Sequence, residues 1–187
     1  MSIRAFLSFD VEDEEVLDRI VDAQRRLALS GARLKLVGRE NVHICIRFLG
    51  QIAPRMVEDI GGIMDGLGFS EFGIGLKGLG AFPSPSYPRV VWVGVKEGAE
   101  ELTRIHDEME RGLAKLGIRP ETRAFRPHCT LARVKGGRRG KLSDVIRSLS
   151  DHEFGTIKAE RLRLKRSVLT PRGPVYTTLY EAVAAKP

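Results

Sequence analysis

The chain has few cysteines, few side-chain amides and no long apolar run. Cysteine occurs only at positions 45 and 129, which excludes a disulfide-rich secreted scaffold and indicates a reducing compartment. No stretch approaches the roughly 20 apolar residues of a membrane-spanning helix. The N-terminal MSIRAFLSFDVEDEE turns acidic too early for a secretory signal peptide. With 42% hydrophobic and 29% charged residues, the composition predicts a globular protein of the cytoplasm.

Basic residues are scarcer in the first half of the chain than in the second. The formal net charge is +7, but the first 94 residues are nearly neutral and the surplus of cations follows them. It is concentrated in residues 119–141, with eight Arg or Lys and one acid, and in residues 158–172, with six and one. Clustered cations are typical of a site for phosphate-rich ligands such as RNA or nucleotides. A solvated basic face gives the same pattern, and charge alone leaves both interpretations open.

The hydrophobic periodicity predicts alternating strands and helices. No Gly/Ser-rich linker or solenoid repeat divides the chain, but a strand that carries His43 is echoed 85 residues later by one that carries His128. We therefore expect one α+β unit over residues 1–187, built of two similar lobes. Strands are expected at 3–9, 33–37, 42–49, 71–82, 90–95, 128–134, 156–168 and 174–183, and helices at 12–30, from 54 to about 61, at 98–116 and at 141–150.

The two histidine strands carry the candidate chemistry. The first reads VHICIRFLG around His43, and the second reads PHCTLARV around His128. Side chains of a strand alternate between its two faces. His43, Cys45 and Arg47 should therefore share one face of the first strand, while His128 and Thr130 share one face of the second. If the two strands are neighbours, two imidazoles, a thiol and a hydroxyl meet in one cleft.

This set of groups suits displacement at phosphorus. Because the pKa of imidazole lies near 6.5, one neutral and one protonated copy coexist near neutrality. The neutral copy takes a proton from the nucleophile, and the protonated copy gives one to the leaving oxygen. Each role is typically worth about 10²–10⁴-fold in rate. Thr130 could hydrogen-bond a phosphate oxygen, and Arg47 or Arg133 could offset its charge. No metal or other cofactor is required.

Two other interpretations of the histidines stay open at this stage. Each histidine could have a purely structural role in its strand. His43, Cys45 and His128 are also acceptable zinc ligands, but the sequence offers no evident fourth ligand beyond distant His106 or His152. We expect His106 at the solvent boundary of its helix and His152 in an exposed loop.

At these residues the chain resembles the two-histidine phosphoesterase superfamily, which is defined by paired His-x-Thr/Ser motifs. Within it, the chain is most similar to the RNA 2′,3′-cyclic phosphodiesterase family, also called 2′-5′ RNA ligase. The similarity follows the chain in order through RAFL, ENVHIC, FLG, PRVVWVG, FRPHCTLAR and LTPRGPVY. It implies a bilobal, duplicated α+β fold in which two antiparallel sheets flank a central cleft, with helices outside and no metal.

The resemblance also implies an activity. This is metal-independent hydrolysis of an RNA terminal 2′,3′-cyclic phosphate to a 2′-phosphate, with reversible 2′-5′ joining of tRNA halves. The expected partners are RNA 3′ ends or nucleotides with a cyclic phosphate, and we expect a monomer that binds no membrane. For a 2′-phosphate product, water must attack in line with the departing O3′. We assign His128 as the base that activates water and His43 as the acid that protonates O3′.

The sequence departs from the family at one motif position. Cys45 stands where the family has Thr or Ser, and a thiol is a weaker hydrogen-bond donor than a hydroxyl. We therefore expect activity at a reduced rate. The family also places the arginine after the second motif, here Arg133, near the phosphate. Strand alternation would put Arg133 on the face opposite Thr130 unless a bulge intervenes.

Three further residues complete the predicted substrate site. Phe125 could stack on a terminal base, although a core position also fits it, and Arg126 follows it next to the second motif. Lys165 belongs to an alternating basic strand whose polar edge could follow the RNA backbone. Two other functions remain as alternatives: a non-catalytic protein that binds RNA or nucleotides, and a phosphoesterase that acts on small cyclic nucleotides.

Overall fold

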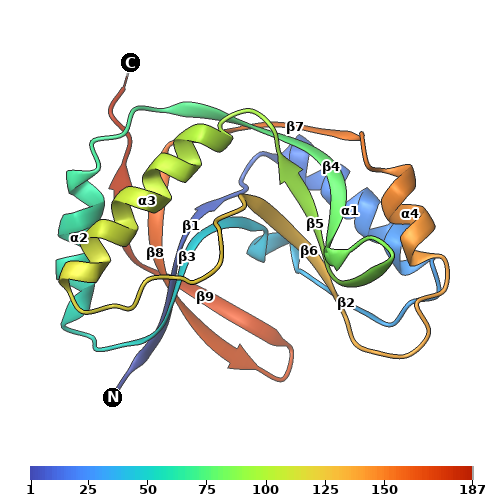
Figure 1. Cartoon of the computed structure of the whole chain (residues 1–187), viewed down its shortest axis with the longest axis horizontal. Coiled ribbons are helices and arrows are strands. Elements are labelled where there is room, and N and C mark those ends of the chain that lie inside the picture. The colour runs from blue at the N-terminus through green and yellow to red at the C-terminus, as the bar shows by residue number, and fades with distance from the viewer. Residues whose placement is uncertain (187) are drawn as a thin grey trace.

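The sheet of this protein is long, antiparallel and strongly curled (Figure 1). The computed structural model describes residues 1–186. Its strands are β1 (Ile3–Asp10), β2 (Leu34–Leu36), β3 (His43–Ile52), β4 (Phe72–Ser84), β5 (Tyr87–Val95), β6 (His128–Val134), β7 (Glu153–Ala159), β8 (Arg161–Thr170) and β9 (Gly173–Val183). They lie in the order β7-β4-β5-β6-β3-β1-β8-β9, and β2 pairs with β6 beside this path.

The helices pack in two groups at the two ends of the sheet. They are α1 (Glu14–Ala28), α2 (Met56–Gly66), α3 (Ala99–Lys115) and α4 (Leu142–Ser148), with a short 3-10 turn, η1 (Arg39–Asn41). Figure 1 shows α2 beside α3 at one end and α1 beside α4 at the other. The hydrophobic core lies between these helices and one face of the sheet. Within residues 1–186, no helix is long and apolar enough to cross a membrane.

The first helix shows how the sequence sets these elements. Asp13 caps α1, because its carboxylate accepts the backbone N–H of Val16 at 2.9 Å. Glu14 and Glu15 lie in the first turn, where they interact favourably with the helix dipole. The apolar stripe that the sequence predicts is buried against the sheet, with Ile20 and Leu27 fully covered. The predicted helix is therefore present, with its ends two residues inside the expected range.

Two elements differ from the sequence prediction. The single strand expected at 156–168 is two strands, because the extended chain passes Glu160 and changes neighbours: β7 pairs with β4, whereas β8 pairs with β1 and β9. The second helix does not fail near residue 61 but continues to Gly66. A Cβ atom on Gly61 would lie 2.6 Å from the ring of Tyr180, so this glycine makes room for close packing and does not end the helix.

Each side of the sheet contains strands from both halves of the chain, because β4 of the first half pairs with β7 of the second and β1 pairs with β8. The two histidine strands meet at the centre of the sheet. β3 belongs to the first half and β6 to the second, and they pair antiparallel at Ile44 and Cys129. The two sheets expected on either side of a cleft are thus hydrogen-bonded edge to edge into one. Ile44 and Cys129 are fully buried on the core side. Their neighbours along each strand therefore face the other way, toward the surface that carries the candidate site.

Candidate active site

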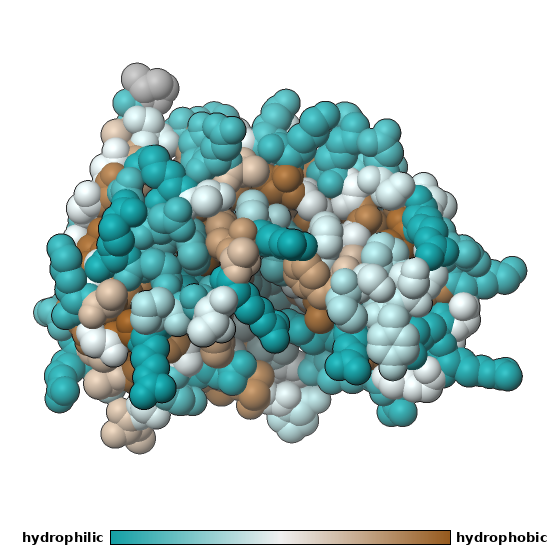
Figure 2. Space-filling model, in the orientation of Figure 1, coloured by the Kyte–Doolittle hydropathy of each residue, from teal (hydrophilic) through white to brown (hydrophobic). Residues whose placement is uncertain are grey.

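His43 and His128 lie on the same face of the sheet, on the neighbouring strands β3 and β6. Around the Ile44–Cys129 pair, the antiparallel register sets His43 beside Thr130 and Cys45 beside His128. The four side chains that the sequence selected for chemistry are therefore brought together at the junction of β3 and β6. Figure 2 shows a hollow near the middle of the molecular surface, rimmed by both hydrophilic and apolar side chains.

Both imidazoles are fixed by the same backbone contact. Nδ1 of His43 lies 2.7 Å from the carbonyl oxygen of Asn41, and Nδ1 of His128 lies 2.6 Å from that of Arg126. A carbonyl oxygen accepts and never donates, so in both rings Nδ1 carries a proton. Nε2 is then the nitrogen that takes up or gives away a proton. In each motif, the carbonyl two residues before the histidine sets the tautomer and the ring orientation.

Aromatic rings enclose each histidine. The centroid of the His43 ring lies 5.0 Å from that of Phe6 and 5.5 Å from that of Tyr176. The centroid of the His128 ring lies 5.0 Å from that of Phe82 and 6.0 Å from that of Trp92. Such rings restrict the imidazoles to one orientation and keep water from much of their surface.

None of these aromatic residues is among the site residues that the sequence predicts. A usable signal was present for Phe6, which alternates with Ala5 and Leu7 and shares its strand face with Arg4 and Ser8. A large aromatic on an otherwise polar strand face indicates a function on that face.

The pKa values of both histidines are lowered. Burial is the main cause for each, because it disfavours the imidazolium. Two neighbouring charges then act on the two pKa values in opposite directions. Asp10 acts to raise the pKa of His43, whereas Arg133 acts to lower that of His128. Lys165 and His128 oppose the effect of Asp10 on His43. The carboxylate thus favours the protonated form of His43, and the guanidinium favours the neutral form of His128.

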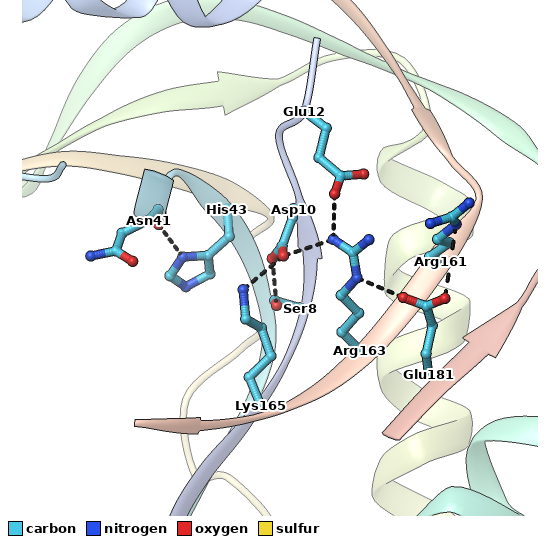
Figure 3. Close-up of polar contacts among 9 residues, drawn as sticks. All are labelled: Ser8, Asp10, Glu12, Asn41, His43, Arg161, Arg163, Lys165 and Glu181. Atoms are coloured by element: carbon cyan, nitrogen blue, oxygen red, sulfur yellow. Dashed lines mark hydrogen bonds and ion pairs between the residues drawn. The ribbon is translucent and has the colours of Figure 1, made fainter. Parts of the chain in front are cut away.

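Asp10 belongs to a cluster of buried charges beside His43 (Figure 3). In the register of β1 and β3, Asp10 is the direct partner of His43. Its Oδ2 accepts from Nζ of Lys165 at 2.7 Å and from Nη1 of Arg163 at 2.8 Å. Arg163 also binds Glu12 and Glu181. These cations outweigh the desolvation of Asp10 and hold its pKa below the usual range, so it remains a carboxylate.

Lys165 was predicted to follow the RNA backbone along a basic strand. The structure places it in this cluster, where its side chain is 7% exposed and its ammonium is bonded to Asp10. Its charge is therefore already balanced by a carboxylate. It reaches the site through that contact and through its position 5.4 Å from the ring centroid of Tyr176.

A bulge in β6 brings Arg133 to the histidine face. Thr130 and Ala132 pair with consecutive residues of β5, so that Leu131 is an extra residue in the ladder. Leu131 and Ala132 are both fully buried on the core side, and the alternation restarts one residue late. Arg133 therefore lies on the same face as His128, exposed to solvent. Simple alternation would place Arg133 on the opposite face, and the bulge is the reason that it lies on the face of His128.

A matching bulge in β3 takes Arg47 away from that face. Cys45 and Arg47 pair with consecutive residues of β1, so that Ile46 is the extra residue here. Ile46 and Arg47 both turn toward the helices, and Phe48 takes the next position on the face of His43, where it is 39% exposed. The prediction that Arg47 shares a face with His43 and Cys45 is wrong, because alternation fails at the bulge.

Arg47 instead forms a buried ion-pair cluster with α3 and the loop after it. Its side chain is 6% exposed and binds the carboxylate of Glu110. It lies 3.4 Å from a carboxylate oxygen of Glu121 and donates to the backbone carbonyl of Arg119 at 2.5 Å. These contacts anchor residues 117–127, the segment that leads into the second histidine motif.

Phe125 belongs to the same anchored segment. Its ring is stacked on that of His106, with 4.3 Å between centroids and 5° between planes. Its partly buried side chain packs against the core, in line with the core position that the sequence left open. His106 is 6% exposed, so its predicted place at a solvent boundary is wrong; the stacked ring covers it. Arg126 is exposed, and its carbonyl orients His128. His152 is exposed, as expected.

The thiol and the hydroxyl occupy equivalent positions. Burial raises the pKa of Cys45 to about 12, so at neutral pH its sulfur keeps a proton that can be donated. Thr130 is partly buried and has the same relation to His128 that Cys45 has to His43. Each motif therefore offers one neutral donor beside its imidazole. Within residues 1–186, no three His, Cys, Asp or Glu side chains are grouped to hold a metal ion, so the grouping that the zinc interpretation needs is not present.

Comparison with known sequences matches the chain to one family in two successive segments. A model of the family described as LigT like Phosphoesterase matches residues 11–92 and residues 93–176. The chain is 45% identical over 171 residues to the RNA 2′,3′-cyclic phosphodiesterase of Aeropyrum pernix, covering 91% of this chain and 97% of that protein. It is 39% identical over 184 residues to the protein of the same name from Methanothermobacter thermautotrophicus, covering 96% and 97%.

Comparison with solved structures supports the same conclusion for the fold. The Thermus thermophilus protein TT0787 superposes with a TM-score of 0.82 at 28% identity, covering 97% of both chains. The Escherichia coli LigT structure with 3′-AMP superposes with a TM-score of 0.79 at 19% identity, covering 99% of both chains. The duplicated α+β fold class predicted from the sequence is confirmed.

Proposed function

The chain belongs to the LigT-like phosphoesterase family, as its two histidine strands predicted, and on that premise we propose that it is an RNA 2′,3′-cyclic phosphodiesterase. Curated relatives with this name cover almost the whole chain. The observation that carries the proposal is the pair of imidazoles on one sheet face, each with Nδ1 held by a backbone carbonyl and Nε2 left for proton transfer. The reaction opens the cyclic phosphate at O3′ and leaves a 2′-phosphate.

In the proposed mechanism, His128 is the general base and His43 the general acid. Nε2 of His128 takes a proton from water as the water oxygen attacks phosphorus. The P–O3′ bond breaks on the opposite side, and Nε2 of His43 gives its proton to O3′. The neighbouring charges support this assignment, because Asp10 favours the imidazolium of His43 and Arg133 favours neutral His128. Each cycle ends with the protons exchanged, and solvent restores them.

Substrate binding supplies the charge that the acid needs. In the free protein both imidazoles have lowered pKa values because they are partly buried. The cyclic phosphate brings one negative charge between them, and an adjacent anion raises the pKa of an imidazole. This anion stabilises the imidazolium of His43, which already faces Asp10, so that His43 takes up a proton from solvent when the substrate binds. Binding and acid catalysis are thereby coupled.

Three groups would stabilise the charge that develops on the phosphate. The hydroxyl of Thr130 and the thiol of Cys45 donate to its two non-bridging oxygens, one from each motif. Arg133 follows Thr130 on the same strand face and supplies a full positive charge that no acid among residues 1–186 pairs with. The removal of one such preorganised donor from a buried site typically costs about 3–4 kcal/mol of transition-state stabilisation. Arg47, which was predicted to share this role, has none in the mechanism.

The test is turnover of a short oligoribonucleotide that ends in a 2′,3′-cyclic phosphate, measured with EDTA present. We expect a 2′-phosphate product and losses of about 10²–10⁴-fold in both His43→Ala and His128→Ala. His152→Ala, at an exposed position outside the site, is the matched control. Binding without turnover would favour the non-catalytic alternative, and turnover of mononucleotides alone would favour the small-nucleotide alternative. A 3′-phosphate product would contradict the assignment of O3′ as the leaving group.

Three finer properties belong to the same proposal. The two halves act as one bilobal unit, since each supplies one histidine, and the unit works as a monomer. A parallel, reversible reaction joins tRNA halves through a 2′-5′ bond: a 5′-hydroxyl takes the place of water, attacks phosphorus, and O3′ leaves as before. The test mixes two such halves and digests the product with a nuclease specific for 3′-5′ bonds; a resistant junction supports ligation. Sedimentation of the active protein checks the monomer.

A further inference from the structure

Four cations line the strand pair that continues away from the histidines. Lys35 of β2 is the register partner of Arg133 of β6. The ladder extends one pair further, because the N–H of Lys135 donates to the carbonyl of Arg33 at 2.8 Å. We call Arg33, Lys35, Arg133 and Lys135 the basic ribbon. All four side chains are exposed.

The basic ribbon lies on the face that carries the histidines. Leu34 and Val134 are register partners, and both pack against the core, as does Ala32. Residues between core-facing positions of a strand point to the opposite face. The bulge at Leu131 puts the ribbon on the same face as Thr130. The cations therefore begin one step beyond the catalytic groups and continue outward on β6 and β2, the paired strands that Figure 1 labels.

No acid balances these four charges. Within residues 1–186, none of the ribbon side chains forms an ion pair or hydrogen bond with an acidic residue. On the other side of His43, two cations of the same sheet face are bound by acids, Arg163 by three carboxylates and Lys165 by Asp10, whereas Arg4 lies over the ring of Phe48. If the ribbon were only a solvated surface, there would be no reason for its cations to differ in this way from Arg163 and Lys165. An array that keeps its charge free on the site's own face fits an anionic ligand.

We propose that the basic ribbon holds the RNA strand that leads into the terminal cyclic phosphate, through its backbone phosphates. Successive ribbon residues on one strand are two positions apart, or about 6.5–7 Å, which matches the order of the spacing between phosphates of an extended strand. The proposal rests on the proposed function and narrows it. The substrate class is a polynucleotide end of several nucleotides, and a mononucleotide lacks the phosphates that the ribbon contacts.

The ribbon changes where RNA contacts are expected along the chain. The sequence placed the basic surplus in the second half, and residues 119–141 contain Arg133 and Lys135. Arg33 and Lys35 come from the nearly neutral first half. They join the array because β2 leaves its own half and pairs with β6. The RNA strand thus contacts both halves of the chain on one side of the site.

The experiment compares kcat/KM for 2′,3′-cyclic AMP with that for an eight-nucleotide RNA ending in 2′,3′-cyclic phosphate. The test variant combines Arg33→Gln, Lys35→Gln and Lys135→Gln, and leaves Arg133 intact. The control variant removes the same charge at exposed positions away from the site, with Arg55→Gln, Arg111→Gln and Lys115→Gln. Thermal melting confirms that both variants are folded.

We expect the ratio of the RNA value to the mononucleotide value to fall by on the order of 100-fold at 0.1 M salt in the test variant. Each contact to a single strand contributes about 0.7 to the slope of log K against log salt, so three lost contacts lower the slope by about 2. The control variant should keep the wild-type ratio and slope. An unchanged ratio in the test variant, or an equal loss in the control, would overturn the ribbon.

A failure of the proposed function would appear separately. If the wild-type protein turns over neither substrate, binding of an eight-nucleotide RNA with a 3′-phosphate is measured by fluorescence anisotropy across the same salt range. A lower affinity and a lower slope in the test variant, but not in the control, then support the ribbon without the enzyme activity. Equal binding by all three proteins overturns it.

Discussion

Ile44 and Cys129, the central residues of the two histidine motifs, pair with each other across β3 and β6. Both are fully buried, so the residues that flank them are turned to the other face together. One backbone pairing thus joins the two halves of the sheet and assembles the site. The imidazole of each half is set beside the hydroxyl or thiol of the other, and neither half has a complete site by itself.

The equivalence of Cys45 and Thr130 predicts opposite effects when the two groups are exchanged. Cys45→Thr supplies a stronger donor and should raise kcat by about 2–10-fold, since a neutral hydrogen bond is worth about 0.5–1.5 kcal/mol. Thr130→Cys places the weaker donor in the second motif and should lower kcat by a similar factor. Single-turnover rates on cyclic-phosphate RNA measure both. If Cys45→Thr is no faster than the wild type, the thiol is no handicap.

The lowered pKa values of the two histidines predict an acidic optimum for catalysis. The reaction needs one protonated and one neutral imidazole, and kcat/KM reports the pKa values of the free enzyme. Since burial lowers both values from about 6.5, the profile of kcat/KM against pH should be bell-shaped with its maximum below about 6.5. A maximum above pH 7 would show that the burial of the rings does not control their titration.

Asp10 should set the position of that optimum through His43. Asp10→Asn removes the charge that raises the pKa of His43 and leaves Lys165, which lowers it. The loss of Asp10 and the remaining charge of Lys165 both lower the pKa of His43, so the maximum of kcat/KM should move to lower pH. Glu12→Gln is the matched control, because it removes one negative charge from the outer side of Arg163. A shift of the same size in both variants would assign the effect to net charge and not to contact with His43.

The assignment of acid and base predicts which variant a better leaving group rescues. When O3′ of the terminal cyclic phosphate is replaced by sulfur, the leaving thiolate needs no proton from the enzyme. The loss in His43→Ala should then shrink toward the wild-type rate, whereas the loss in His128→Ala should persist because water must still be activated. Rescue of His128→Ala in place of His43→Ala would reverse the two roles.

The buried cluster around Arg47 predicts a stability effect. Arg47→Met leaves the carboxylate of Glu110, itself largely buried, without its partner, and such a loss typically costs about 3–5 kcal/mol. In a chain of this length the melting temperature should fall by on the order of 10 °C. Arg39→Met, which removes a surface ion pair to Glu14 and Asp18, should change it much less. If Arg47→Met melts like the wild type but no longer binds RNA, Arg47 contacts the substrate and its role is not structural.

Local patterns in the sequence were sufficient for most of the fold. The capped helix after Asp13, the alternating strand around Ile44 and the repeated histidine strand each follow from the periodicity of neighbouring residues. They also predicted the motif residues that share a face, since alternation holds from His43 to Cys45 and from His128 to Thr130. The family assignment came from the order of these motifs along the chain.

Alternation failed one residue beyond each motif. The bulges at Ile46 and Leu131 move Arg47 away from the site and bring Arg133 to it. A bulge depends on the partner strand, because two residues oppose one across the ladder, and the sequence of a single strand does not contain that information. The same limit applies to residues 156–168, where the extended chain changes partners near Glu160.

The sequence by itself determined the two histidines, their neighbouring donors and the excess of positive charge. The tertiary structure alone decided which cations are free. Lys165 and Arg133 look alike in the sequence, yet β1 places Asp10 against Lys165, and β2 places Lys35 beside Arg133. The charge available to a phosphate is a sum over neighbours in space, and those neighbours are set by strand pairing between residues far apart in the chain.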